Sequence, residues 1–87
     1  MVRRARRARP RSLPAVFAGL GPRLIELRRA RGWSQGELGR QSKVQQALVG
    51  RYEHGTQRPS EATLRRLADA LGADYAELAR LAGYPTP

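Results

Sequence analysis

Gln45, Gln46 and Arg51 lie on one side of a predicted helix, and their side chains could hydrogen-bond to nucleic-acid bases. In the DNA major groove, glutamine can pair bidentately with adenine, and arginine with guanine. The opposite side of the same helix is apolar at spacings of four residues: Val44, Leu48 and Tyr52. A helix divided in this way, within a strongly basic chain, is typical of an element that reads the major groove.

The composition favours a polyanionic partner. The chain has 87 residues and a formal net charge of +10, which points to nucleic acid first, and then to an anionic membrane surface or an acidic protein. A chain of this length forms one small domain with a small core. No apolar run approaches the roughly 20 residues that a membrane span needs. We therefore expect a cytoplasmic, nucleoid-associated protein without a membrane segment.

Enzymatic chemistry is disfavoured because the residue types for it are missing. The chain has no cysteine and a single histidine, so neither a disulfide framework nor a cysteine metal site is available. The sequence contains no phosphate-cradling loop and no pairing of a nucleophile with a base. We expect no catalytic residue, no metal site and no cofactor.

Arginines are concentrated at the start of the chain. Residues 1–11 contain six arginines and no acid, residues 23–58 eight basic residues and three acids, and residues 59–87 three arginines and four acids. An acid-free, arginine-rich stretch cannot bury an apolar face, so residues 1–18 are predicted to form a flexible, disordered basic arm. Its candidates for phosphate contact are Arg3, Arg4, Arg6 and Arg7. A solvated tail, a polybasic membrane contact and a targeting segment are the alternatives.

The remaining chain reads as five helices. Apolar residues recur at spacings of three and four, with serine or aspartate before several helices and glycine after most of them. The predicted helices begin near Gly21, Ser34, Gln45, Ser60 and Asp74, and they end near Gly32, Ser42, His54, Gly72 and Gly83. No sustained two-residue alternation indicates a strand. The predicted fold is all-α, with a helical domain over residues 19–83 and a short tail over residues 84–87.

Three local features refine this outline. Pro22 suits the first position of the first helix. Ser34 and Glu37 form a capping box, in which the serine accepts the N–H of residue 37 and the glutamate reaches back to Ser34. Gly39 weakens the second helix by about 1 kcal/mol relative to alanine, and a close crossing with the third helix would account for it.

Residues 20–78, about two-thirds of the chain, resemble the DNA-binding domains of helix-turn-helix proteins of the Cro and phage-repressor type. The first part of the matching pattern comprises Leu24, Leu27, Arg28, Arg31, Ser34, Gln35, Glu37, Leu38 and Val44. The second part comprises Tyr52-Glu53-His54-Gly55 with Pro59, and then Leu64, Leu67, Ala68, Leu71 and Gly72. The second part, E-x-G-x-x-x-P followed by L-x-x-L-A-x-x-L-G, is more specific than a helix-turn-helix pattern alone. The resemblance implies a five-helix, Cro/repressor-like helix-turn-helix domain.

The resemblance also implies roles for individual side chains. Bases would be read by Gln46, Ala47 and Arg51, with the alanine methyl against a thymine methyl. Phosphates would be contacted by Gln35 and Gln45. Lys43 and Arg58 are further candidates for phosphate contact, which the resemblance itself does not imply. Arg28 and Glu53 would form an ion pair that ties the first helix to the end of the third.

Two residues depart from the family pattern. Lys43 stands in the turn where many members have glycine, so it either adopts a left-handed conformation or lies in a slightly different turn and reaches a phosphate. Gly50 falls on the side of the third helix that would face DNA. It either permits a closer backbone approach or loosens specificity.

The function that follows is a sequence-specific DNA-binding transcriptional regulator, in particular a repressor. Its recognition helix would span residues 45–54 in the major groove of double-stranded DNA. One such helix covers only a few base pairs, so we expect a homodimer on a palindromic site, with Leu81 and Tyr84 as candidate dimer contacts. The alternatives are a protein-interaction module, such as an antitoxin or a polymerase-binding factor, and a sequence-independent nucleic-acid binder.

Overall fold

The computed structural model describes residues 19–85, and over that range it contains five helices and no strand. The helices are α1 (Leu20–Ala30), α2 (Gln35–Ser42), α3 (Gln46–His54), α4 (Glu61–Leu71) and α5 (Tyr75–Leu81). The predicted all-α, five-helix fold is therefore confirmed. The predictions for the arm, residues 1–18 with Arg3, Arg4, Arg6 and Arg7, lie outside the described residues.

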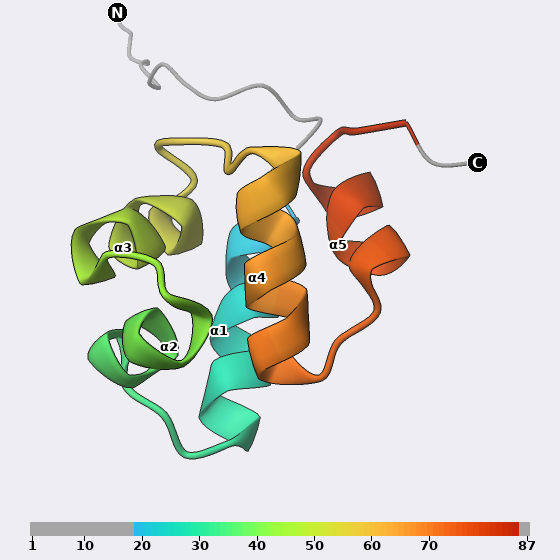
Figure 1. Cartoon of the computed structure of the whole chain (residues 1–87). Helices are drawn as coiled ribbons and strands as arrows, with labels where there is room; N and C mark the ends of the chain where they lie inside the picture. Colours follow the sequence, from blue (N-terminus) through green and yellow to red (C-terminus); the bar gives the residue numbers. More distant parts are fainter. Residues whose placement is uncertain (1–18, 86–87) are drawn as a thin grey trace, which may run out of the picture.

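The helices are arranged around α4. Figure 1 shows α2 and α3 on one side of α4 and α5 on the other. The packed pairs are α2 with α3, α1 with α3, α2 with α4, and α4 with α5. The helix-turn-helix pair α2–α3 is thus supported from behind by α1 and α4, and its outer surface is left open.

The core is built mainly from leucines. Leu24, Leu38, Leu64, Leu67 and Leu78 have no exposed surface, and they come from α1, α2, α4 and α5. Burying one such side chain contributes roughly 1.5–3 kcal/mol relative to leaving it exposed. The packing between helices, rather than any covalent cross-link, holds this small domain together.

Side chains cap three of the helix N-termini. The hydroxyls of Ser34 and Ser60 accept the backbone N–H of Glu37 and Thr63, each at 3.1 Å. The carboxylate of Asp74 accepts the N–H of Ala76 at 3.3 Å. These contacts satisfy N–H groups that have no partner within their helix.

The capping box at the start of α2 is only half formed, which corrects the prediction for Glu37. The carboxylate of Glu37 accepts hydrogen bonds from Gln41, at 2.8 Å, and from the guanidinium of Arg40, instead of the N–H of Ser34. A charged donor one turn away is a stronger partner for a carboxylate than a neutral backbone N–H. These contacts, with Gln41 first and Arg40 second, lower the pKa of Glu37 below its ordinary value.

The first helix begins earlier than predicted. It starts at Leu20, with Gly19 as its N-cap, so that Pro22 is the third helical residue rather than the first. A proline is tolerated there because the first N–H groups of a helix have no intrahelical acceptor in any case. The earlier start places Leu20 in the core with 1% of its surface exposed.

Candidate nucleic-acid interface

A close crossing of α2 and α3 sets the geometry of the helix-turn-helix pair. A Cβ atom on Gly39 would lie 2.7 Å from the carbonyl oxygen of Val44, so no side chain fits there. The backbone N–H of Val44 donates to the carbonyl of Gly39 at 2.9 Å, and the hydroxyl of Ser42 donates to the carbonyl of Leu38 at 2.6 Å. The glycine that weakens α2 is therefore needed where the chain turns back against it.

Lys43 forms the turn in a left-handed conformation, with φ 61° and ψ 40°. Among residues 19–85 it is the only residue other than glycine with a positive φ. This conformation ends α2, and it is the one that the family's glycine would adopt without strain. Of the two alternatives for Lys43, the left-handed turn is the one observed.

The buried face of α3 is formed by Val49, Tyr52 and Glu53, which are 0%, 4% and 6% exposed. Leu48, predicted for the same apolar side, is half-buried and packs against the core. The prediction omitted Val49, although its spacing of three from Tyr52 is a helical signal. Val44 is buried, but it precedes α3 and reaches the core from the turn.

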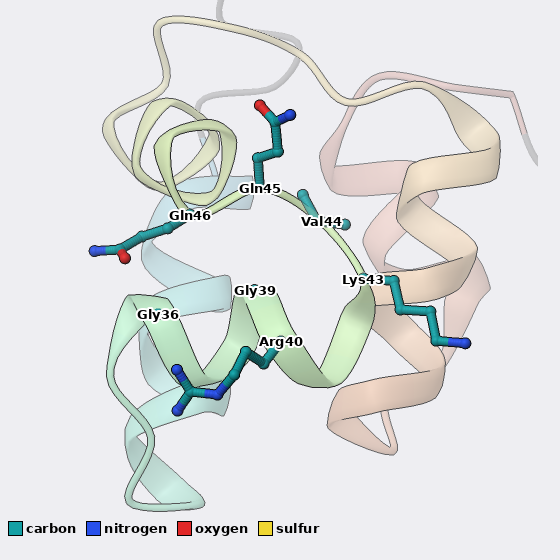
Figure 2. A pocket seen from close by; sticks show the side chains of 7 residues that line it. All are labelled: Gly36, Gly39, Arg40, Lys43, Val44, Gln45 and Gln46. Carbon is teal, nitrogen blue, oxygen red and sulfur yellow. The ribbon is translucent and has the colours of Figure 1, made fainter.

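Of the side chains expected to read bases, Ala47 and Arg51 line one surface hollow on α3, whereas Gln46 lies beside α2. Gln46, Ala47 and Arg51 are all exposed. Gln45 is the N-cap of α3 by its extended backbone, but its side chain does not bond to the helix. In Figure 2 the side chain of Gln45 points away from α2. It is therefore available for an external contact.

Arg28, Glu53 and Gln35 form one hydrogen-bonded network behind α3. The guanidinium of Arg28 donates to Glu53 through Nε, at 2.6 Å, and through Nη2, at 3.0 Å. The side-chain amide of Gln35 donates to the same carboxylate at 3.0 Å. The Glu53 side chain is 2% exposed, and its hydrogen bonds raise the pKa of Arg28. The ion pair implied by the family resemblance is thus present, and Gln35 extends it to the start of α2.

A hollow of about 380 Å³ lies beside the turn. Its lining comprises Gly36, Gly39, Arg40, Lys43, Val44, Gln45 and Gln46. Figure 2 shows the side chains of Arg40 and Lys43 pointing in opposite directions from α2. Arg40 is not among the residues predicted from the sequence to contact DNA. Arg40 follows Gly36 by four residues, so both lie on the same face of α2. That spacing is the sequence signal that places Arg40 beside the start of the helix pair.

Arg58 is placed away from this cluster. Its guanidinium lies 4.2 Å from the centre of the Tyr84 ring, and it donates to the carbonyl of Ala82 at 3.3 Å. The Tyr84 hydroxyl donates to the carbonyl of Pro59 at 2.9 Å. Both side chains therefore connect the loop after α3 to the end of α5 within the same chain.

Neither a membrane helix nor a metal site is found in the part of the chain that the structure describes. No helix within residues 19–85 is long and apolar enough to cross a membrane. In the same range, no group of three or more histidine or acidic side chains could hold a metal ion.

Comparison with known proteins places this geometry in context. A family model described as a helix-turn-helix domain matches residues 19–81. The crystal structure of an HTH_3 family transcriptional regulator from Vibrio cholerae is similar, with a TM-score of 0.67 and 28% sequence identity. The similarity covers 74% of this chain and 36% of that chain, so this chain corresponds to about a third of that regulator. No curated protein matches the sequence.

Proposed function

The chain belongs to the helix-turn-helix domain family, and on this basis we propose that it is a sequence-specific DNA-binding transcriptional regulator that acts as a repressor. The observation that carries the proposal is the division of α3. Val49, Tyr52 and Glu53 fix one face of this helix in the core. The opposite face presents Gln46, Ala47 and Arg51 to solvent on a rigid support.

In this proposal α3 enters the major groove and its exposed side chains choose the bases. Gln46 pairs with adenine and Arg51 with guanine, and each bidentate pair contributes roughly 1–3 kcal/mol of discrimination. Within residues 19–85, Arg51 makes no ion pair and no side-chain hydrogen bond, whereas Arg28 and Arg40 have acidic partners. The guanidinium of Arg51 therefore gives up no ion pair or hydrogen bond with residues 19–85 when it pairs with a base.

Phosphate contacts surround this helix and supply affinity that depends on salt. Because the side-chain amide of Gln35 already bonds to Glu53, the backbone N–H at the start of α2 is the better donor to phosphate. Gln45, Lys43 and Arg40 add donors around the turn. Arg40 can leave Glu37 for a phosphate at small cost, since its side chain is 71% exposed and such pairs are weak. Arg58 and the basic arm are further candidates.

A symmetric dimer on a palindromic site completes the proposal. One recognition helix reads only a few base pairs, and two copies one helical turn of DNA apart double the site. Leu81 remains a candidate dimer contact because it is only half-buried. Tyr84 is a weaker candidate, since its hydroxyl and ring already contact Pro59 and Arg58.

Selection of bound duplexes from random DNA tests this function. We expect the selection to enrich a defined sequence with two-fold symmetry. At both 50 mM and 200 mM salt, the affinity for that sequence should exceed the affinity for a scrambled duplex. Enrichment of no sequence, together with equal binding to all duplexes, would establish a sequence-independent nucleic-acid binder instead.

A further inference from the structure

A second hollow, of about 250 Å³, lies on the outer face of α3. Its lining comprises Ala47, Gly50, Arg51, His54 and Thr56. The first four positions follow the i, i+3, i+4, i+7 spacing of one helix face, so the hollow follows the surface that the proposed function places against DNA. It exists because Ala47 carries only a methyl group and Gly50 carries no side chain.

Apart from the guanidinium of Arg51 and the Nε2 of His54, the polar side-chain atoms that line this hollow have partners within the protein. The Nδ1–H of His54 donates to the carbonyl of Gly50 at 3.2 Å. The hydroxyl and the backbone N–H of Thr56 both donate to the carbonyl of Arg51, at 3.3 Å and 3.0 Å. Ala47 and Gly50 contribute no polar side-chain atom. The hollow therefore suits an apolar group better than a hydrogen-bonding one.

The guanidinium of Arg51, which has no ion pair or hydrogen bond with residues 19–85, lies at the edge of the hollow. Most arginines of residues 19–85 have internal partners: Arg23, Arg28 and Arg40 pair with acids, Arg31 and Arg58 donate to carbonyls, and Arg65 lies over Tyr75. Within the same range Arg51 has no such contact. A guanidinium without a partner among the described residues and an apolar depression therefore lie within one helical turn of each other, and each can contact a different group on a base pair.

We propose that this hollow receives the 5-methyl group of a pyrimidine stacked next to the guanine that Arg51 reads. The inference rests on the proposed function, because it needs α3 in the major groove. The 5-methyl of thymine is the apolar group that base pairs expose there, and the guanidinium pairs with the O6 and N7 atoms of guanine. The half-site therefore contains a thymine–guanine step, or a 5-methylcytosine–guanine step in its place.

This assignment gives Gly50 a role in specificity. A Cβ atom at residue 50 would meet only the side chain of Gln35, at 3.6 Å, which is an ordinary contact. Alanine therefore fits at this position and strengthens the helix, so the fold does not require the glycine. Gly50 lines the hollow, so we expect a side chain at residue 50 to occupy part of the space for the methyl group.

The test compares duplexes that differ by one methyl group. The first probe is a duplex obtained by selection from random DNA. The guanine that Arg51 reads is identified as the position at which the Arg51→Ala variant no longer prefers one base. In the matched probes, the adjacent pyrimidine is thymine, uracil, cytosine or 5-methylcytosine. Burial of one methyl group stabilises the complex by about 0.8 kcal/mol, which is about fourfold in Kd. We expect thymine to bind about fourfold tighter than uracil, and 5-methylcytosine to exceed cytosine by a similar factor.

Two variants that fill the hollow complete the test, together with a control. In Ala47→Leu and Gly50→Ala we expect the thymine duplex to bind less than about twofold tighter than the uracil duplex. Ala30→Leu, at an exposed site on α1, should keep the wild-type ratio of the two Kd values. The inference is overturned if uracil and thymine bind equally to a selected duplex, or if the filled variants retain the fourfold ratio. Failure to select any sequence would instead overturn the proposed function.

Discussion

At the turn between α2 and α3, Lys43 adopts a backbone conformation that favours glycine, with φ 61° and ψ 40°. A residue with a Cβ atom in this region costs roughly 1–2 kcal/mol relative to a right-handed conformation. The strain is retained at the site where a cation adjoins the entry to α3. Figure 2 shows the side chain of Lys43 directed away from Arg40. Lys43 also lines a further depression together with Arg66 and Asp69 of α4.

Two substitutions at this position separate backbone strain from charge. Lys43→Gly should raise the free energy of unfolding by about 0.5–1 kcal/mol, because glycine adopts the left-handed conformation without strain but loses more entropy on folding. Lys43→Ala keeps the strain and should leave stability nearly unchanged. Both should weaken DNA binding equally if the ammonium contacts phosphate. Urea titrations and binding isotherms measure the two effects, and equal stability of the two variants would refute the strain.

Tyr52 links the core to pH. Burial raises the pKa of its phenol above the ordinary value. The folded state therefore holds the proton more tightly than the unfolded state, and this contribution to stability is complete below the ordinary pKa of about 10.

The free energy of unfolding should accordingly fall as the pH rises above about 10, toward the raised pKa of Tyr52. The control is Tyr52→Phe, which lacks the phenol and should show a shallower decline over the same range. Denaturant titrations between pH 8 and pH 11 measure both slopes. Parallel curves for the two proteins would contradict the role of this phenol.

Among the elements, α3 is held by two devices: the network from Arg28 through Glu53 to Gln35, and the crossing at Gly39. The network ties α1, α2 and α3 together at a carboxylate that is 2% exposed. The crossing brings the backbone of residue 44 against α2. Together they set where the outer face of α3 lies.

Removal of Arg28 should be strongly destabilising. Arg28→Ala leaves the Glu53 carboxylate buried with only the amide of Gln35 as a partner, and we expect a loss of about 3 kcal/mol. The comparison is Arg23→Ala, since Arg23 contacts Glu77 at 2.8 Å but both side chains are about one-third exposed. That substitution should have a far smaller effect. Chemical denaturation of both variants measures the difference, and similar losses would contradict the burial argument.

Two glycines in the helix pair should respond oppositely to alanine. Gly39→Ala places a Cβ atom 2.7 Å from the carbonyl of Val44 and should destabilise the fold by about 1–3 kcal/mol. Gly50→Ala meets no such contact and should stabilise it by about 1 kcal/mol. Thermal unfolding of the two variants decides the matter, and a stabilising Gly39→Ala would disprove the close crossing.

The sequence predicts the elements better than it predicts their contacts. Serine, aspartate and glycine mark most helix ends, because caps are local. Val49 is fully buried while Leu48 packs against the core only in part; this difference depends on how α3 rotates against α1 and α2, which spacing within one helix does not determine. Arg58 illustrates the same limit: its cation stacks on Tyr84, 26 residues away in the chain, and no local signal predicts that partner.

In the whole molecule, the part of the chain that contains the helix-turn-helix pair is basic, and the part that supports it is nearly neutral. Residues 23–58 carry eight basic residues and three acids, whereas residues 59–87 carry three and four. The basic part contains α2 and α3, and the nearly neutral part contains α4 and α5, which form much of the support. An excess of positive charge around an exposed helix face attracts a polyanion to that face.

The most direct test of whether the outer face of α3 reads bases uses the variant Arg51→Ala. The measurement is the ratio of its Kd values for a scrambled duplex and for a selected duplex, compared with the ratio for the wild type. Our account predicts that the ratio of the two Kd values falls by roughly tenfold or more, since one bidentate contact with guanine is lost. For the scrambled duplex, the substitution should weaken binding only slightly, because only the charge attraction of Arg51 is lost. If Arg51→Ala weakens both duplexes by the same factor, Arg51 contacts phosphate alone and α3 does not read bases through it.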